Sequence, residues 1–212
     1  MRIHKIVAVF FIFALMAGCN RYKPQETFEQ AVSFGDTKAV AYYLKHKADP
    51  NQKNQLGAPM LLVATFQPNP SIVSQLLAAG ADVNLTAPDG TSALIGACAM
   101  GYTEQVQALL QAGANVNQAN DDGITPLLAA SSEGFTEIIK LLLKNNADIN
   151  ARTKWGLTSL QSAIVYGHSE VVPLLKEAKN AADEAAKAAG KTADAAKTDA
   201  AKPAQDATPA AK

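Results

Sequence analysis

The sequence is poor in the residues from which metal and catalytic centres are usually built. Its 212 residues include only two cysteines and three histidines, and Lys+Arg and Asp+Glu both total 19. The two cysteines, Cys19 and Cys98, cannot form a disulfide framework or a paired-cysteine zinc motif. A zero net charge leaves no surplus of positive charge to neutralise a phosphate backbone. We therefore expect no metal, no cofactor and no nucleic-acid partner.

The first nineteen residues have the pattern of an export signal. Arg2 and Lys5 give a basic start, and residues 6–17 form an apolar run. A helix needs about 20 apolar residues to span a bilayer, so this run is too short for an ordinary membrane anchor. Loss of the leader with Arg2 and Lys5 leaves 17 basic residues against 19 acidic ones.

The end of this leader carries a cysteine after small residues. Leu15-Met-Ala-Gly-Cys19 resembles the lipobox of bacterial lipoproteins, with methionine where leucine is most common. The resemblance implies that residues 1–18 are a signal peptide, that Cys19 is acylated, and that residues 19–24 form a linker. Asn20 differs from the aspartate of inner-membrane retention, which favours the periplasmic face of a Gram-negative outer membrane. The alternative is a soluble periplasmic protein with a chance cysteine.

From residue 25 to residue 178 the sequence repeats every 33 residues. Each unit has the pattern of a helix, a turn, a second helix and a loop. In the fourth unit, Pro126 lies in the first turn of a helix, Gly134 ends that helix, and residues 137–144 have helical apolar spacing. The periodic positions include the glycines Gly57, Gly90, Gly123 and Gly156, the asparagines Asn51, Asn84, Asn117 and Asn150, and the leucines Leu76, Leu109, Leu142 and Leu175.

Three recurring segments resemble the signature of the ankyrin repeat. They are Gly123-Ile-Thr-Pro-Leu127, Gly134-Phe-Thr-Glu-Ile138 and Asn146-Ala-Asp-Ile-Asn150. The resemblance implies an all-α ankyrin-repeat solenoid over residues 25–178, in which stacking of the units supplies the core. We place about five units, at 25–54, 55–87, 88–120, 121–153 and 154–178.

The units depart from the family pattern at several points. Pro68-Asn-Pro70 replaces the Gly-His turn of the second unit, and Pro173 is expected to kink or delay the last helix. The family's histidine after Thr-Pro-Leu is replaced by Leu62, Ile95, Leu128 and Gln161.

Residues 179–212 form a low-complexity tail of alanine, lysine and acidic residues. Its composition cannot supply a core, which predicts a disordered or partly helical segment. Helix propensity is high up to about Ala189, and Gly190, Pro203 and Pro209 are expected to interrupt it. We favour a solubilising end over a tether to a cell-wall partner.

The residues with catalytic potential are better explained as structural. His46 lies at a helix end, where positive charge is favourable, and His168 lies at the family's ordinary turn position. Cys98 follows Ala97 at a position that the family fills with small buried residues. We therefore expect no catalytic residue and no enzyme activity.

The ankyrin resemblance implies that a monomeric chain binds a protein partner through its concave surface. The hairpin tips and the late positions of the first helices form that surface. We select Trp155, Tyr166, Met100, Glu133 and Phe66 as candidate partner-binding residues, because exposed aromatic side chains anchor interfaces. Trp155 and Phe66 have packing against neighbouring repeats as their alternative, which we favour for Phe66. The alternative functions are an immunity or inhibitor protein against a periplasm-acting toxin or enzyme, and a scaffold between membrane and cell wall.

Overall fold

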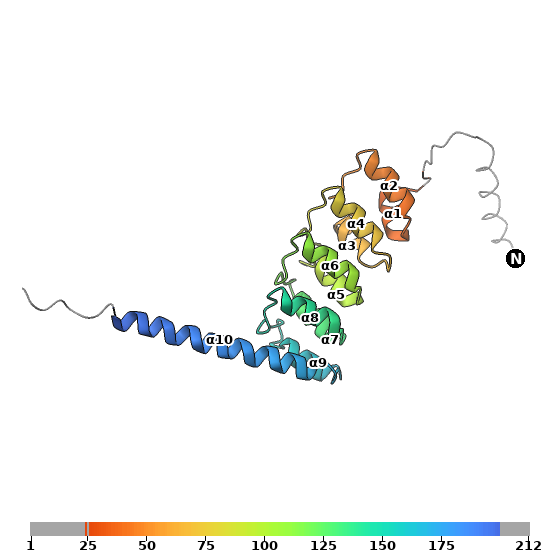
Figure 1. Cartoon of the computed structure of the whole chain (residues 1–212). Coiled ribbons are helices and arrows are strands. Elements are labelled where there is room, and N and C mark those ends of the chain that lie inside the picture. Colours follow the sequence, from red (N-terminus) through yellow and green to blue (C-terminus); the bar gives the residue numbers. More distant parts are fainter. Residues whose placement is uncertain (1–23, 25, 200–212) are drawn as a thin grey trace, which may run out of the picture.

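The structure, a computed structural model, describes residue 24 and residues 26–199 (Figure 1). The proposed leader, the candidate lipidation site Cys19, and the prolines Pro203 and Pro209 lie outside the described residues. Within the described part the helices are α1 (Phe28–Phe34), α2 (Thr37–Lys45), α3 (Met60–Ala64), α4 (Ser71–Ala78), α5 (Ala93–Met100), α6 (Thr103–Gln111), α7 (Pro126–Ser132), α8 (Thr136–Lys144), α9 (Ser159–Val165) and α10 (Val172–Asp199).

The helices form pairs that stack in chain order. The first helices of the pairs (α1, α3, α5, α7 and α9) contact one another in sequence and make one layer. The second helices α2, α4, α6 and α8 make the other layer in the same way. Figure 1 shows this stack, with α10 packed against α9 and extending well beyond the other helices. The arrangement confirms the predicted all-α solenoid.

The fourth unit shows why each pair folds as it does. The Oγ1 atom of Thr125 accepts a hydrogen bond from the backbone N–H of Leu128 at 3.3 Å, which caps the start of α7. Pro126 follows at the first helical position, where a missing N–H costs nothing. After α8, Asn146 adopts a left-handed backbone with φ of 63°, as its residue type predicted. Lys47, Gly80 and Gly113 hold the same left-handed position in the first three units.

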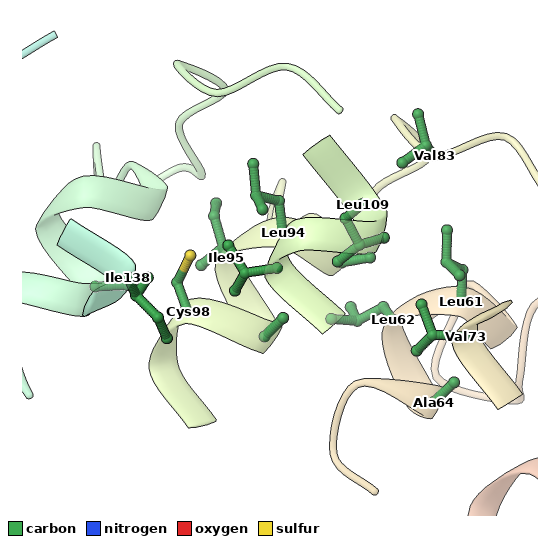
Figure 2. Close-up of a cluster of buried hydrophobic side chains, with 14 of the residues drawn as sticks. Leu61, Leu62, Ala64, Val73, Val83, Leu94, Ile95, Cys98, Leu109 and Ile138 are labelled. Carbon is green, nitrogen blue, oxygen red and sulfur yellow. The ribbon is translucent and has the colours of Figure 1, made fainter. Parts of the chain in front are cut away.

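A continuous apolar core runs through the stack between the two layers. The periodic leucines Leu76, Leu109, Leu142 and Leu175 are all fully buried. Figure 2 shows the middle of this core, where Cys98 lies among the aliphatic side chains. Each unit therefore depends on its neighbours for burial of its apolar side chains.

The periodic asparagines connect neighbouring units along the loop edge of the stack. Each accepts a hydrogen bond from a backbone N–H of the next unit. The bonds join Asn51 to Asp82 at 2.7 Å, Asn84 to Asn115 at 2.8 Å, and Asn117 to Asp148 at 2.8 Å. We call Asn51, Asn84 and Asn117 the asparagine ladder. These bonds hold the hairpin loops in a constant register.

The irregular turn at Pro68-Asn-Pro70 is accommodated by two glutamine side chains. Nε2 of Gln67 donates to the backbone oxygen of Ser33 at 2.6 Å. Nε2 of Gln105 donates to the backbone oxygen of Gln67, also at 2.6 Å. In the last unit, Nε2 of His168 lies 2.8 Å from the backbone oxygen of Ser132. Different side chains therefore bind a backbone oxygen near the end of the preceding first helix.

The last helix differs from the sequence expectation at two points. The second helix of the fourth unit, α8, begins at Thr136, and the position 33 residues later is Ser169. The last helix, α10, begins only at Val172, so Pro173 delays the helix rather than kinking it. The expected interruption at Gly190 was wrong, because α10 continues to Asp199. One glycine costs a helix only about 1 kcal/mol, and alanine, the best helix former, surrounds it. Among the described helices, none has the length and hydropathy needed to cross a membrane.

Candidate functional site

Two rows of side chains with the 33-residue period make up the surface that the ankyrin resemblance identifies as concave. One row lies at the ends of the first helices and consists of Phe34, Gln67, Met100, Glu133 and Tyr166. The other row lies at the hairpin tips and consists of Leu56, Asp89, Asp122 and Trp155. Both rows are variable in chemistry, while the core behind them is mainly apolar.

A pocket of about 340 Å³ opens on this surface across the third, fourth and fifth units. Three of the five predicted partner-binding residues (Trp155, Tyr166 and Glu133) line it together. The rest of its wall is made by Ile95, Ala99, Asn120, Ile124, Leu128, Ala129, Ser132, Thr153, Leu157 and Ser162. Aliphatic and small side chains on α5, α7 and α9 thus form the floor, together with the rings of Trp155 and Tyr166 in the pocket wall.

The other two predicted residues do not line this pocket. Met100, the last residue of α5, and Phe66, in the turn after α3, are both exposed. Phe66 keeps 50% of its surface exposed, so packing against neighbours accounts for only part of this side chain. All five predicted residues are therefore exposed, but only the three nearest the C-terminal end of the stack line the pocket.

Trp155 is held at the hairpin tip by the residue before it. The Lys154 ammonium forms an ion pair with the Asp122 carboxylate of the preceding unit. The backbone N–H of Lys154 donates to the backbone oxygen of Asp122 at 2.8 Å. The Lys154 ammonium also lies 4.7 Å from the centre of the Trp155 ring, in cation–π contact. The indole nevertheless remains 63% exposed and Tyr166 62% exposed. The Trp155 ring is therefore supported by the fold, and both rings are accessible to a partner.

Glu133 is the one charged side chain in the pocket wall. It is exposed and has no hydrogen bond or ion pair with any described residue. It is also the C-terminal cap of α7, where the helix end carries a partial negative charge. A carboxylate here receives no stabilisation from its own helix and remains free for a ligand.

Two apolar residues at the end of α9, Ile164 and Val165, are exposed. Val165 is a late position on the first helix that the sequence identifies, whereas Ile164 was missed. The equivalent positions of the earlier units (Val32, Thr65, Cys98 and Ser131) are all fully buried, but Ile164 is 56% exposed. The exposure of Ile164 could have been predicted from the number of repeats, because the residues after the fifth unit do not form a sixth unit that would cover this side of α9.

The residues with catalytic potential have structural roles. Besides its contact with Ser132, His168 lies 3.4 Å from a carboxylate oxygen of Glu170. His46 is the C-cap of α2, and its ring stacks on Tyr42 with 4.0 Å between the ring centres. Burial raises the pKa of the Cys98 thiol far above its usual value, which keeps it unreactive. Among the described residues, no three potential metal ligands gather in one place.

Comparison with known proteins agrees with this architecture. A family model described as ankyrin repeats (3 copies) matches residues 28–120 and 109–187. A comparison with curated proteins finds no match to the chain. The period, the paired helices and the family match together show that this chain belongs to the ankyrin-repeat family.

Proposed function

We propose that this protein binds a protein partner through its concave surface, with the pocket between the third and fifth units as the anchoring point. Ankyrin repeats form a protein–protein interaction domain, so binding is the activity that the fold supplies. The observation that carries the finer proposal is that Trp155, Tyr166 and Glu133 line one pocket while remaining exposed.

The binding mechanism would be preorganised recognition. The rings of Trp155 and Tyr166 have few rotatable bonds, so fixing them in a complex costs little conformational entropy. The cation–π contact and ion pair of Lys154 reduce that cost further for Trp155. Burying such a ring in a partner typically contributes about 2 kcal/mol or more at an interface hot spot. This mechanism requires no cofactor and no chemical turnover.

We also propose that the chain acts at the periplasmic face of an outer membrane, anchored by acylated Cys19. Support comes from the basic start, the apolar run and the Leu15-Met-Ala-Gly-Cys19 segment. The linker of about six residues reaches roughly 20 Å at most, which would keep the solenoid close to the membrane. In cells grown with labelled palmitate, Cys19→Ser should abolish labelling and move the protein out of the membrane fraction. Unchanged labelling of this variant would overturn the anchor.

A cross-linked pull-down from intact cells tests the partner-binding surface. The test variant is Trp155→Ala with Tyr166→Ala, and we expect it to lose a partner that the unmodified chain retains. The control is Phe34→Ala with Leu56→Ala. These residues hold the same two register positions at the other end of the stack and are even more exposed, at 74% and 81%. The control should retain the partner.

Three outcomes would contradict this proposal. Equal recovery from the test variant and the unmodified chain would place binding elsewhere. Loss of the partner from the control alone would move the site to the N-terminal end of the concave surface. Loss only after deletion of residues 179–212 would make the tail the binding segment and favour a scaffold.

A further inference from the structure

We propose that the pocket receives an arginine side chain of the partner, with its guanidinium held between the Glu133 carboxylate and the rings of Trp155 and Tyr166. This inference rests on the proposed function and specifies the chemistry of the partner at that site.

The shape of the pocket favours one long side chain. Its volume of about 340 Å³ is at the lower end of the range for small-molecule pockets. Its floor consists of aliphatic and small side chains, including Ile95, Ala99 and Leu128. Such a floor binds an apolar stem, and arginine carries three methylene groups before its charged head.

The charge of the pocket favours a cation. Glu133 has no partner among the described residues, and the C-terminal end of α7 adds negative potential at the same place. Asp89 stands on the neighbouring hairpin, where hydrogen bonding from the Thr91 backbone N–H lowers its pKa and keeps it ionised. A carboxylate left unpaired in a complex would lose hydration without compensation, so an anionic or purely apolar occupant is disfavoured.

The basic side chains nearby do not cancel this potential. Lys154 is neutralised by its ion pair with Asp122. Arg152 donates from Nη1 to the backbone oxygen of Gly156 at 2.8 Å, which holds its guanidinium on the hairpin. Neither residue lines the pocket. Asp121, next to Asp122 at the same tip, adds a further negative charge.

The aromatic rings favour arginine over lysine. Trp155 already attracts the ammonium of Lys154, which shows that a cation is stable beside its ring. Tyr166 supplies a second accessible ring in the same pocket wall. A planar guanidinium stacks flat on such rings and donates two parallel hydrogen bonds from two nitrogens to one carboxylate, whereas an ammonium is a point charge without this planar geometry.

Selection from a random peptide display library tests this chemistry directly. The full chain, purified in detergent, is the target, and peptides are recovered and sequenced. We expect peptides with one arginine flanked by apolar residues. The selection is repeated on Glu133→Gln and on the matched control Glu104→Gln, which removes the same charge from exposed Glu104 on α6, outside the pocket. The arginine preference should vanish with Glu133→Gln and persist with Glu104→Gln.

A double-mutant cycle on one selected peptide then assigns the contact. Replacing its arginine by citrulline, a neutral near-isostere, should weaken binding roughly tenfold, as expected for loss of one charge-assisted contact. Glu133→Gln should weaken binding of the arginine peptide by a similar factor. The two changes together should cost no more than either alone, because they remove the same interaction. Binding is followed by the fluorescence of Trp155, the single tryptophan of the chain.

The outcomes separate this inference from the proposed function. Peptides that depend on Trp155 and Tyr166 but show no arginine preference, or additive losses in the cycle, would overturn the arginine and leave the concave site standing. Peptides indifferent to Trp155→Ala with Tyr166→Ala would contradict the proposed site as well. A library that yields no binder would also overturn the inference, because the pocket would then accept no peptide side chain.

Discussion

The two ends of the solenoid connect neighbouring units through different side chains, which bind backbone oxygens near the ends of the first helices. At the N-terminal end, Gln67 and Gln105 donate to backbone oxygens of the preceding unit. At the C-terminal end, His168 contacts the Ser132 oxygen, and a Cβ added to Gly134 would meet its Nδ1 atom at 2.5 Å. The comparison teaches that side chains of different type and register position can bind a backbone oxygen near the end of a preceding first helix.

The largest expected loss of stability comes from core substitutions, which test whether both ends of the solenoid share one cooperative core. Leu76→Ala and Leu142→Ala remove equivalent, fully buried side chains from the two ends. Each should lower the free energy of unfolding by about 2–5 kcal/mol, through lost burial and the cavity left behind. Urea unfolding followed by circular dichroism measures this change. Equal losses with a single transition would show that the ends are equally coupled.

The control for this measurement is Leu56→Ala, which removes the same side chain from an exposed hairpin tip. It should change the free energy of unfolding by no more than about 0.5 kcal/mol. Two separated transitions in either core variant would show instead that the N-terminal units unfold independently of the C-terminal ones.

A smaller loss of stability distinguishes the glutamine contact between units from the histidine contact. Gln105 is fully buried, so Gln105→Leu leaves the Gln67 oxygen without a donor. We expect a loss of about 1–3 kcal/mol in the free energy of unfolding. His168 retains 28% exposure of its side chain, so water replaces its contact more readily after His168→Leu. That variant should lose about 1 kcal/mol or less. A larger loss in the free energy of unfolding from His168→Leu than from Gln105→Leu would contradict this prediction.

The sequence was sufficient to predict the regular features that the two ends of the solenoid share. The period predicts the helix pairs, and Pro126 and Gly134 predict where the first helix of the fourth unit begins and ends. The role of Gln105 was missed, although a signal existed. It occupies the register of Ile72 and Ile138, where the other units bury an aliphatic residue. A glutamine there, one unit after a turn without its usual histidine, indicates a side chain that reaches back to the preceding unit.

The candidate site was predicted only in part for a physical reason. Register alone identifies which side chains face the concave surface, and this suffices for Trp155, Tyr166 and Glu133. The depth of the surface depends on the size of the side chains between the rows. Small residues such as Ala99 and Ser132 open the pocket under Trp155, and their contribution requires three units to be placed together. Met100 and Phe66 share the rows but not this pocket.

The smallest effect concerns the asparagine ladder, where the two ends should behave alike. Asn117 accepts from the Asp148 N–H and donates from Nδ2 to the Asn146 oxygen at 3.2 Å. Asn84 makes the same pair of bonds one unit earlier, to the Asn115 N–H and to the Gly113 oxygen at 3.4 Å. Because these sites are exposed, Asn117→Ala and Asn84→Ala should each lower the free energy of unfolding by only about 0.5 kcal/mol, the lower end of the range for a hydrogen bond.

Hydrogen exchange locates this loss more sharply than unfolding does. The amide of Asp148 should exchange faster in Asn117→Ala, and that of Asn115 in Asn84→Ala, since each loses its acceptor. Asn145→Ala is the matched control, because Asn145 bonds the Leu141 oxygen of its own unit and should leave both amides unchanged. Faster exchange at Asp148 but not at Asn115 would mean that the asparagine ladder stabilises only the C-terminal units. The two ends of the solenoid would then differ in their hairpin loops as well as in their turns.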